Sequence, residues 1–352
     1  MPDWRADWPT TKKRWLAFWD HGCVDRPVLQ LAVPRRGAAA PPPALARDHE
    51  IPEKRHADAE HIYRWGLHVL EQTSFWAEGL PLLHSGSSVG QALYYGCAPR
   101  FTAASAWAEP LPGHARQVPA LDPGNRWVAW HRDALRLLAA RCGGRYFMLP
   151  TFGNHAGDTL ALIRGAGQLM LDALEDPAWT RGTDLRVGRE LTGVINERFA
   201  DIEAAGMDGH MNDAGMWAPR RPWDIHCDLS CMVSTRVFRD VFWPSQREVI
   251  DQSDGYNYYH VDGPGVLNHL DFILEEPGIQ AIQWVPGVGR FHCLKYVGLY
   301  RKILARGKSI QVIADHGDVV PFLKRVPPDG VCMLVTGCPD EDAAARLVDQ
   351  VE

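Results

Sequence analysis

The chain has 352 residues, of which 46% are hydrophobic and 23% are charged, and this balance is ordinary for a globular protein. Its formal net charge of −6 argues against a general nucleic-acid binder, which is normally basic. No stretch reaches about 18 consecutive apolar residues, and the polar N-terminus lacks the pattern of a signal peptide, so we expect a cytoplasmic protein without a membrane span. Eight scattered cysteines argue against a disulfide framework.

The predicted elements alternate between strands and helices along most of the chain. Residues 1–24 predict a helical lead-in, and residues 34–54 and 84–128 predict long loops or insertions. Helical patterns lie at 56–72, 130–144 and 158–174, and again between the later strands. Short apolar runs predict strands at 26–33, 75–83, 145–150, 207–213, 255–262, 279–287, 309–315 and 330–337.

This alternation favours a parallel sheet, and eight strand–helix units favour a closed barrel. We therefore predict an α/β fold of the (β/α)8 TIM-barrel type, with an N-terminal helical extension and long βα loops. The whole chain, residues 1–352, forms one domain in this interpretation. A doubly wound open sheet is the alternative.

In a (β/α)8 barrel the functional side chains lie at the C-terminal ends of the strands. Polar residues follow most of the predicted strands, which suggests one polar end of the barrel. They are Arg35, Arg36, His155, Asp158, Asn212, Asp213, His260, Asp262, Gln283, Trp284, Asp315, His316 and Cys338.

Three groups of residues could carry chemistry. His260-x-Asp262 with Cys338 from a distant strand end is an acceptable zinc set that leaves one position open, although Asp262 could equally cap a turn while Cys338 packs. His226-Cys227-Asp228-x-x-Cys231 has ligand spacing without a second pair, which favours a loop with buried cysteines. Asp315-His316 could supply a general base.

Several common motifs are missing from the sequence. There is no G-x-x-x-x-G-K-[ST] loop, no dinucleotide fingerprint and no G-x-S-x-G elbow. Phosphoryl transfer, hydride transfer and serine hydrolysis therefore lose their usual support.

The segment "CDLSCMVSTRVFRDVFWPSQREVIDQSDGYNYYHVDGPG" resembles the uroporphyrinogen decarboxylase superfamily. Members carry a similar "D…S…F…P" stretch, followed by a strand that ends in a histidine near a glycine-containing turn. The segments "DRPVL", "DTLALIRGAGQLMLDALEDP" and "GCPDEDAAARLVDQV" agree, so that the resemblance covers roughly residues 25–350. It implies a (β/α)8 barrel. It also implies one of two chemistries: decarboxylation without a cofactor, or zinc-dependent methyl transfer between a corrinoid protein and a thiol, with folate-using relatives.

The chain departs from the decarboxylase branch of that family. The arginine-rich "RQAGRY" stretch is replaced by "LAVPRRGAAAPPP", and the aspartate of the second strand is missing from "TSFWAEGLPLL", where Glu78 is the nearest carboxylate. The methyltransferase branch has His-x-Cys after the fifth strand and a lone cysteine near the end. His260 and Cys338 match these positions, while Asp262 replaces the first cysteine.

The resemblance therefore implies a methyltransferase-like enzyme that moves a methyl group between a corrinoid or folate carrier and a small acceptor. A corrinoid would arrive on a partner protein, because "ADHGDVV" lacks the spacing of a corrinoid-binding motif. The alternatives are a cofactor-free decarboxylase or lyase that grips a carboxylate with Arg35 or Arg36, and a barrel that binds a small ligand or partner without turnover. The implied zinc ligands are His260, Asp262 and Cys338; the implied catalytic residues are Asp228, Asp213 and Asp262; and the implied substrate-binding residues are Asn212, Trp217, Tyr259, Trp284, Gln283, Arg35 and His316.

Overall fold

The computed structural model describes residues 6–86, 90–113, 116–150, 155–287 and 292–352. Its central feature is a seven-stranded sheet with strands in the order β2-β1-β13-β12-β11-β10-β9. All neighbours are parallel except β2, which runs antiparallel to β1. The strands are β1 (Val28–Pro34), β2 (Thr73–Ala77), β9 (Trp223–Ile225), β10 (Asn257–Asp262), β11 (Ala281–Val285), β12 (Ser309–Asp315) and β13 (Val331–Thr336).

Three short two-stranded pairs accompany this sheet. The first pair, β3 (Leu82–Leu83) and β6 (Phe147–Met148), is parallel, and β6 contacts β7 of the third pair. The other two pairs are antiparallel: β4 (Ala98–Phe101) with β5 (Ala106–Glu109), and β7 (His210–Met211) with β8 (Trp217–Ala218). The hydrogen-bonded ladders of the described residues do not close a ring. The fold is mixed α/β and TIM-barrel-like, without a closed barrel among these residues.

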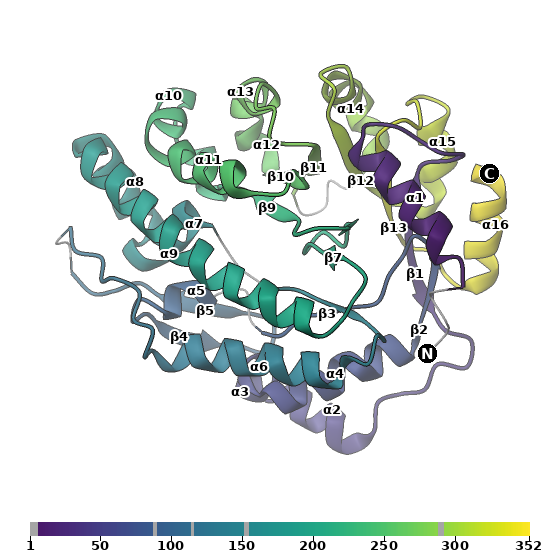
Figure 1. The fold of residues 1–352 in the computed structure, drawn as a ribbon, viewed down its shortest axis with the longest axis horizontal. Coiled ribbons are helices and arrows are strands. Elements are labelled where there is room, and N and C mark those ends of the chain that lie inside the picture. Colours follow the sequence, from purple (N-terminus) through teal and green to yellow (C-terminus); the bar gives the residue numbers. More distant parts are fainter. Residues whose placement is uncertain (1–5, 87–89, 114–115, 151–154, 288–291) are drawn as a thin grey trace.

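Helices surround the strands on the outside (Figure 1). Five of them begin at a side chain that accepts a backbone N–H: Asp58, Asn125, Asp176, Ser234 and Asp340. None of the described helices is both long and apolar enough to cross a membrane. The helices are α1 (Trp8–Trp19), α2 (Pro43–Glu50), α3 (Pro52–Ala57), α4 (Ala59–Glu71), α5 (Gly90–Leu93), α6 (Arg126–Cys142), α7 (Ala156–Arg164), α8 (Ala166–Glu175), α9 (Pro177–Ala204), α10 (Thr235–Val237), α11 (Trp243–Gln252), α12 (Gly263–Val266), α13 (Leu270–Leu274), α14 (Val297–Leu304), α15 (Val319–Leu323) and α16 (Glu341–Val351).

The two faces of the sheet have different neighbours because side chains alternate along each strand. On β10, Tyr259 and Val261 belong to the large apolar core between the sheet and the helices. Tyr258 belongs to a second apolar cluster together with Trp15 and Phe18 of α1. The N-terminal helix therefore covers the end of the sheet interior where the parallel strands begin, and it leaves the other end for polar side chains.

A buried ion network fixes α1 to the edge of the sheet. Glu78 is completely buried and bonds Arg14 at 3.0 Å and Arg26 at 2.7 Å. Its carboxylate also accepts the backbone N–H of Leu29 at 3.0 Å. A buried charge is tolerated only when it is paired and hydrogen-bonded, and Glu78 meets this condition.

Several sequence predictions need correction. The predicted loop at 34–54 contains α2 and the start of α3, and the predicted loop at 84–128 contains the β4–β5 hairpin. The strand predicted at 75–83 divides into β2 and β3, and Ala77 at the end of β2 has φ 52°. The strand predicted at 207–213 shortens to β7, which pairs with β8 and lies outside the main sheet. The helical lead-in at 1–24 is confirmed as α1, with residues 1–5 outside the described residues.

Candidate functional site

Three ionisable side chains alternate along the segment that includes β9. Asp224 lies in β9, and His226 and Asp228 follow it at intervals of two residues. Successive side chains of an extended segment point to opposite sides, so a spacing of two places these groups on one side. His226 is buried, whereas Asp224 and Asp228 are partly buried. The segment therefore directs three ionisable groups into one polar cluster.

His226 lies between two carboxylates. Its Nδ1 atom is 3.1 Å from Asp224 Oδ2, and its Nε2 atom is 3.5 Å from Asp158 Oδ2. Burial alone would lower the pKa of His226, but Asp224 and Asp158 hold that pKa well above its ordinary value. Burial would raise the pKa of Asp224, yet His226 keeps it below its usual range. The two carboxylates therefore favour the protonated form of His226, with Nδ1 hydrogen-bonded to Asp224 and Nε2 within ion-pair distance of Asp158.

Asp158, at the start of α7, also orders the backbone beside the cluster. It accepts the N–H of Asp228 at 3.0 Å and of Leu229 at 2.9 Å. Both donors lie at the beginning of a 3-10 helix, Asp228–Met232. One carboxylate thus fixes the position of His226 and the main chain that presents Asp228.

A second carboxylate group forms around Asp213, which follows β7. The Tyr258 hydroxyl donates a hydrogen bond to Asp213 Oδ1. Burial, with the nearby Asp224 carboxylate adding to it, raises the pKa of Asp213 to about 7. The Asp213 side chain is exposed and lines a cavity. Near neutral pH, Asp213 therefore exchanges a proton readily.

The clearest candidate for a cation site consists of Asp228, His260 and Asp262. Their ligand atoms lie within 4.8 Å of one another. Asp228 Oδ1 is buried and has no hydrogen-bond partner among the described residues. One imidazole nitrogen and two carboxylates are a usual donor set for zinc and for harder divalent cations. The residues present therefore fit a bound cation with open coordination positions.

The structure does not bring Cys338 into this group. Its thiol approaches the carbonyl oxygen of Asp340 at 3.8 Å, and the group gathers Asp228 beside His260 and Asp262 instead. His155, Asp224 and His226 form another group within 4.8 Å. Because both nitrogens of His226 already face carboxylates, that second group is better described as an ion-pair chain.

A row of hydrogen-bonded glutamines begins at His260 of the cation-site candidate and links side chains from four strands. His260 Nδ1 is hydrogen-bonded to Gln283 Oε1, and Gln283 Nε2 donates to Gln311 Oε1 at 2.6 Å. Gln311 Nε2 then donates to Gln30 Oε1 at 2.6 Å and to the Ala214 carbonyl at 2.7 Å. Gln30 Nε2 donates to the Gly215 carbonyl at 2.6 Å. The three glutamines are buried, so their partners are fixed within the protein.

The carbonyl groups at one end of this row decide the tautomer of His260 at the other. A carbonyl can only accept, so the ends of Gln30 and Gln311 that face Gly215 and Ala214 must be NH2 groups. Each following amide is then oriented in turn, and Gln283 presents its oxygen to His260. His260 must therefore carry its proton on Nδ1, which leaves the Nε2 lone pair available to a cation.

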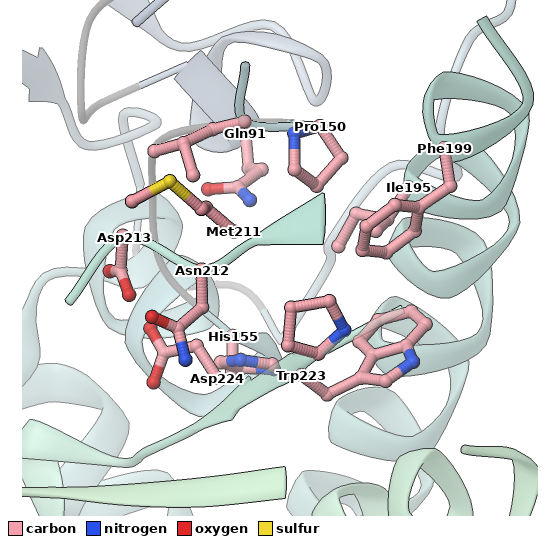
Figure 2. A pocket seen from close by; sticks show the side chains of 12 residues that line it. Gln91, Pro150, His155, Ile195, Phe199, Met211, Asn212, Asp213, Trp223 and Asp224 are labelled. Atoms are coloured by element: carbon pink, nitrogen blue, oxygen red, sulfur yellow. The ribbon is translucent and has the colours of Figure 1, made fainter. Parts of the chain in front are cut away.

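Beside the cluster lies a small cavity with about 50 Å³ of free space (Figure 2). Polar side chains form one part of its wall, and they come from four separate regions of the chain: Gln91, His155, Asn212, Asp213 and Asp224. Apolar side chains form the rest: Leu149, Pro150, Ile195, Phe199, Met211, Pro222 and Trp223. Two of the residues expected to bind substrate, Asn212 and Asp213, lie in this cavity wall.

The three aromatic residues expected to bind substrate lie elsewhere. Tyr259 and Trp284 pack in the core between sheet and helices, with the Trp284 ring 5.5 Å from that of Tyr296. Their positions follow from alternation, because His260 and Gln283 occupy the opposite face. Trp217 packs in the apolar cluster under the sheet and donates to the Asp208 carbonyl at 2.9 Å. These rings support the fold around the site and do not line the cavity.

Arg35 and His316 also lie away from the cavity wall. The Arg35 guanidinium donates to the Thr73 carbonyl at 2.7 Å, which ties the end of β1 to the start of β2. The exposed Arg36 pairs with Asp342 of α16 at 2.8 Å. His316 begins a 3-10 helix after β12. The arginines are thus used in holding adjacent elements together.

Comparison with known proteins gives the class of fold. No protein-family model matches the sequence, and no curated protein sequence matches it. Among solved structures, the chain is similar to a methyltransferase from Methanosarcina mazei, with a TM-score of 0.56 and 12% sequence identity. The alignment covers 97% of this chain and 97% of that chain. At this identity the likeness establishes a shared fold over the whole chain.

Proposed function

We propose that the protein is a methyltransferase-like enzyme of the uroporphyrinogen decarboxylase superfamily. It would move a methyl group between a corrinoid or folate carrier and a small acceptor activated beside a bound cation. The likeness to a methyltransferase over 97% of each chain supports this class. The observation that carries the proposal is the group Asp228, His260 and Asp262, because it lies where β10 ends and β9 continues into its loop.

Asp228, His260 and Asp262 would hold the cation, with zinc as the expected metal. A bound cation would supply Lewis acidity, which lowers the pKa of an acceptor group so that it becomes nucleophilic near neutral pH. Asp262 stands where methyltransferase relatives are expected to have cysteine, and its oxygen suits nitrogen or oxygen acceptors as well as thiols.

The surrounding residues have supporting tasks. Gln283 keeps the His260 proton on Nδ1, and Asp158 holds the main chain of Asp228 through two N–H bonds. Asp213, with its pKa of about 7, is placed to accept a proton from a substrate in the cavity. These tasks require only groups that the chain itself provides.

Nothing in the arrangement favours decarboxylation of an anionic substrate. That alternative needs a cationic grip, and the residues expected to supply it, Arg35 and Arg36, bond the Thr73 carbonyl and Asp342. The described cavity wall contains carboxylates and has no arginine or lysine. An anionic substrate would meet like charges there.

Elemental analysis and a methyl-transfer assay test the proposal together. We expect about one divalent cation for each chain in the wild type, and strong loss in His260→Ala and Asp228→Asn, because each change removes one of three ligands. Asp240→Asn, which changes an exposed aspartate paired with Arg239, is the matched control and should keep the cation. Methyl transfer from methylcobalamin or methyltetrahydrofolate should fall in parallel. A wild-type protein without bound cation, or one that releases CO2 from a carboxylate in the presence of a chelator, would overturn the proposal.

A further inference from the structure

The cavity beside the ion-pair chain has two chemically different sides. Ile195 and Phe199 of α9 and Trp223 of β9 form an apolar side, while Asp213 and Asp224 form an acidic side (Figure 2). Its free space of about 50 Å³ admits a ligand of only a few heavy atoms. A ligand that matches both sides has a short hydrocarbon part and one strongly polar group.

Buried polar atoms without hydrogen-bond partners indicate the kind of polar group that a ligand would bring to the cavity. Gln91 Oε1, Asn212 Nδ2 and Asp224 Oδ1 are all buried and have no hydrogen-bond partner among the described residues. The Gln91 and Asn212 side chains are only 3% and 4% exposed, respectively, and both line the cavity. Buried polar groups are normally paired, so these atoms indicate an occupant. Two of the three atoms are acceptors, and they call for a ligand with more than one donor.

The charges around the cavity select a cation. Asp213 faces Asp224, Tyr258 and His226, while Asp224 also faces His155 and His260. His226 supplies one positive charge. Burial and the neighbouring His226 lower the pKa of His155 to about 3, so His155 adds none near neutral pH.

The neutral form of His155 leaves the wall with an excess of carboxylate. Asp213 and Asp224 are both carboxylates, and His226 can balance only one of them. A cation in the cavity would compensate the second charge.

We propose that this cavity binds a small primary or secondary ammonium ion with a short hydrocarbon group. Its N–H groups donate to Asp213, Asp224 Oδ1 and Gln91 Oε1, and its hydrocarbon part packs against Ile195 and Phe199. The proposal names the substrate class of the proposed methyltransferase and rests on that function only in calling the ligand a substrate. As a substrate, the ammonium ion would first lose one N–H proton to Asp213. The freed lone pair would then form the new bond to the methyl carbon, while the methyl–carrier bond breaks and leaves its electron pair on the carrier. Binding itself needs no catalysis.

Calorimetry on the full chain tests the ligand class with three probes of similar shape: n-propylammonium, n-propanol and propionate. We expect binding of the ammonium ion at least tenfold tighter than that of the alcohol, and none of propionate. Affinity for n-propylammonium should rise as the pH rises through about 7, because Asp213 loses its proton there while an alkylammonium, with a pKa of about 10, keeps its charge. Equal affinities for the three probes would overturn the proposal, since cavity water alone would then satisfy the unpaired atoms.

Two variants test whether the cavity is the binding site, and circular dichroism checks that they fold. Asp213→Asn should weaken n-propylammonium binding at least tenfold and remove its pH dependence, and Gln91→Leu should weaken it several-fold. Asp254→Asn, which changes an exposed aspartate near Arg220, is the control and should bind as the wild type does. Unchanged affinity in both cavity variants, with folding confirmed by circular dichroism, would overturn the proposal. Ammonium binding without its methylation would refute only the substrate role, whereas methyl transfer to thiols without ammonium binding would refute the cavity assignment alone.

Discussion

Gln311 offers a sharp test of the glutamine row, because it is completely buried and bonds on both sides. Gln311→Leu keeps a similar volume but removes the partners of Gln283 Nε2 and of the Ala214 carbonyl. Gln30 Oε1 also loses its bond from Gln311 and keeps only the Cys332 thiol at 3.2 Å. The carbonyl would retain only a 3.5 Å approach from Gln30 Nε2. Each buried polar group left unpaired costs about 1–3 kcal/mol. Two such groups, partly offset by the added apolar burial, should lower the free energy of unfolding by about 3 kcal/mol.

Urea denaturation measures this loss, and 15N spectroscopy of the histidine side chains measures its local effect. Wild-type His260 should appear as the Nδ1–H tautomer alone. In Gln311→Leu the Gln283 amide is free to turn over, so a second, Nε2–H population should appear. Gln350→Leu, the same change at an exposed position of α16, should alter stability by less than about 0.5 kcal/mol. A loss below about 1 kcal/mol, or a single unchanged His260 tautomer, would refute the reasoning.

Three further outcomes follow from the buried charges and the cation-site candidate. Glu78→Ala leaves Arg14 and Arg26 buried without their shared carboxylate and should cost about 3–5 kcal/mol in urea denaturation; a cost near zero would show that the network is dispensable. Because the pKa of Asp213 rises from 3.8 to about 7 on folding, the wild type should lose stability relative to Asp213→Asn as the pH rises through that interval, and parallel stability curves would contradict this. Cys338→Ser should retain bound metal in elemental analysis, whereas a loss of metal would make the thiol a ligand.

The repeating architecture could be predicted from sequence where strands are long and apolar. The segments 255–262, 309–315 and 330–337 agree closely with β10, β12 and β13, which lie between neighbours on both sides. The three-residue β9 could not be found in this way, because it is too short to show alternation and follows an irregular proline-containing stretch. The antiparallel course of β2 depends on its pairing with β1, which no local pattern specifies.

The site was predictable only in part, for a related reason. His260, Asp262, Asp213 and Asn212 lie at the C-terminal ends of predicted strands, and a local rule could find them. Asp224 was missed, although "DIHCD" carries Asp224, His226 and Asp228 at alternate positions, a signal of three polar groups on one face.

The glutamine row was missed for a different reason. Gln30 and Gln311 lie inside apolar strands, and only the register of β12 with its neighbours reveals that they meet across the sheet interior.

The turn between β7 and β8 joins the two halves of the site. Asn212 and Asp213 belong to the cavity wall, and the next two residues, Ala214 and Gly215, supply the carbonyls that orient the glutamine row. Gly215 has φ +74°, and a Cβ there would come within 2.9 Å of Gln30 Nε2, so no other residue fits this turn without displacement. An occupant that shifts this four-residue segment alters the amides that set His260 for metal. Thermodynamic linkage then requires metal to change the affinity for that occupant by the same factor.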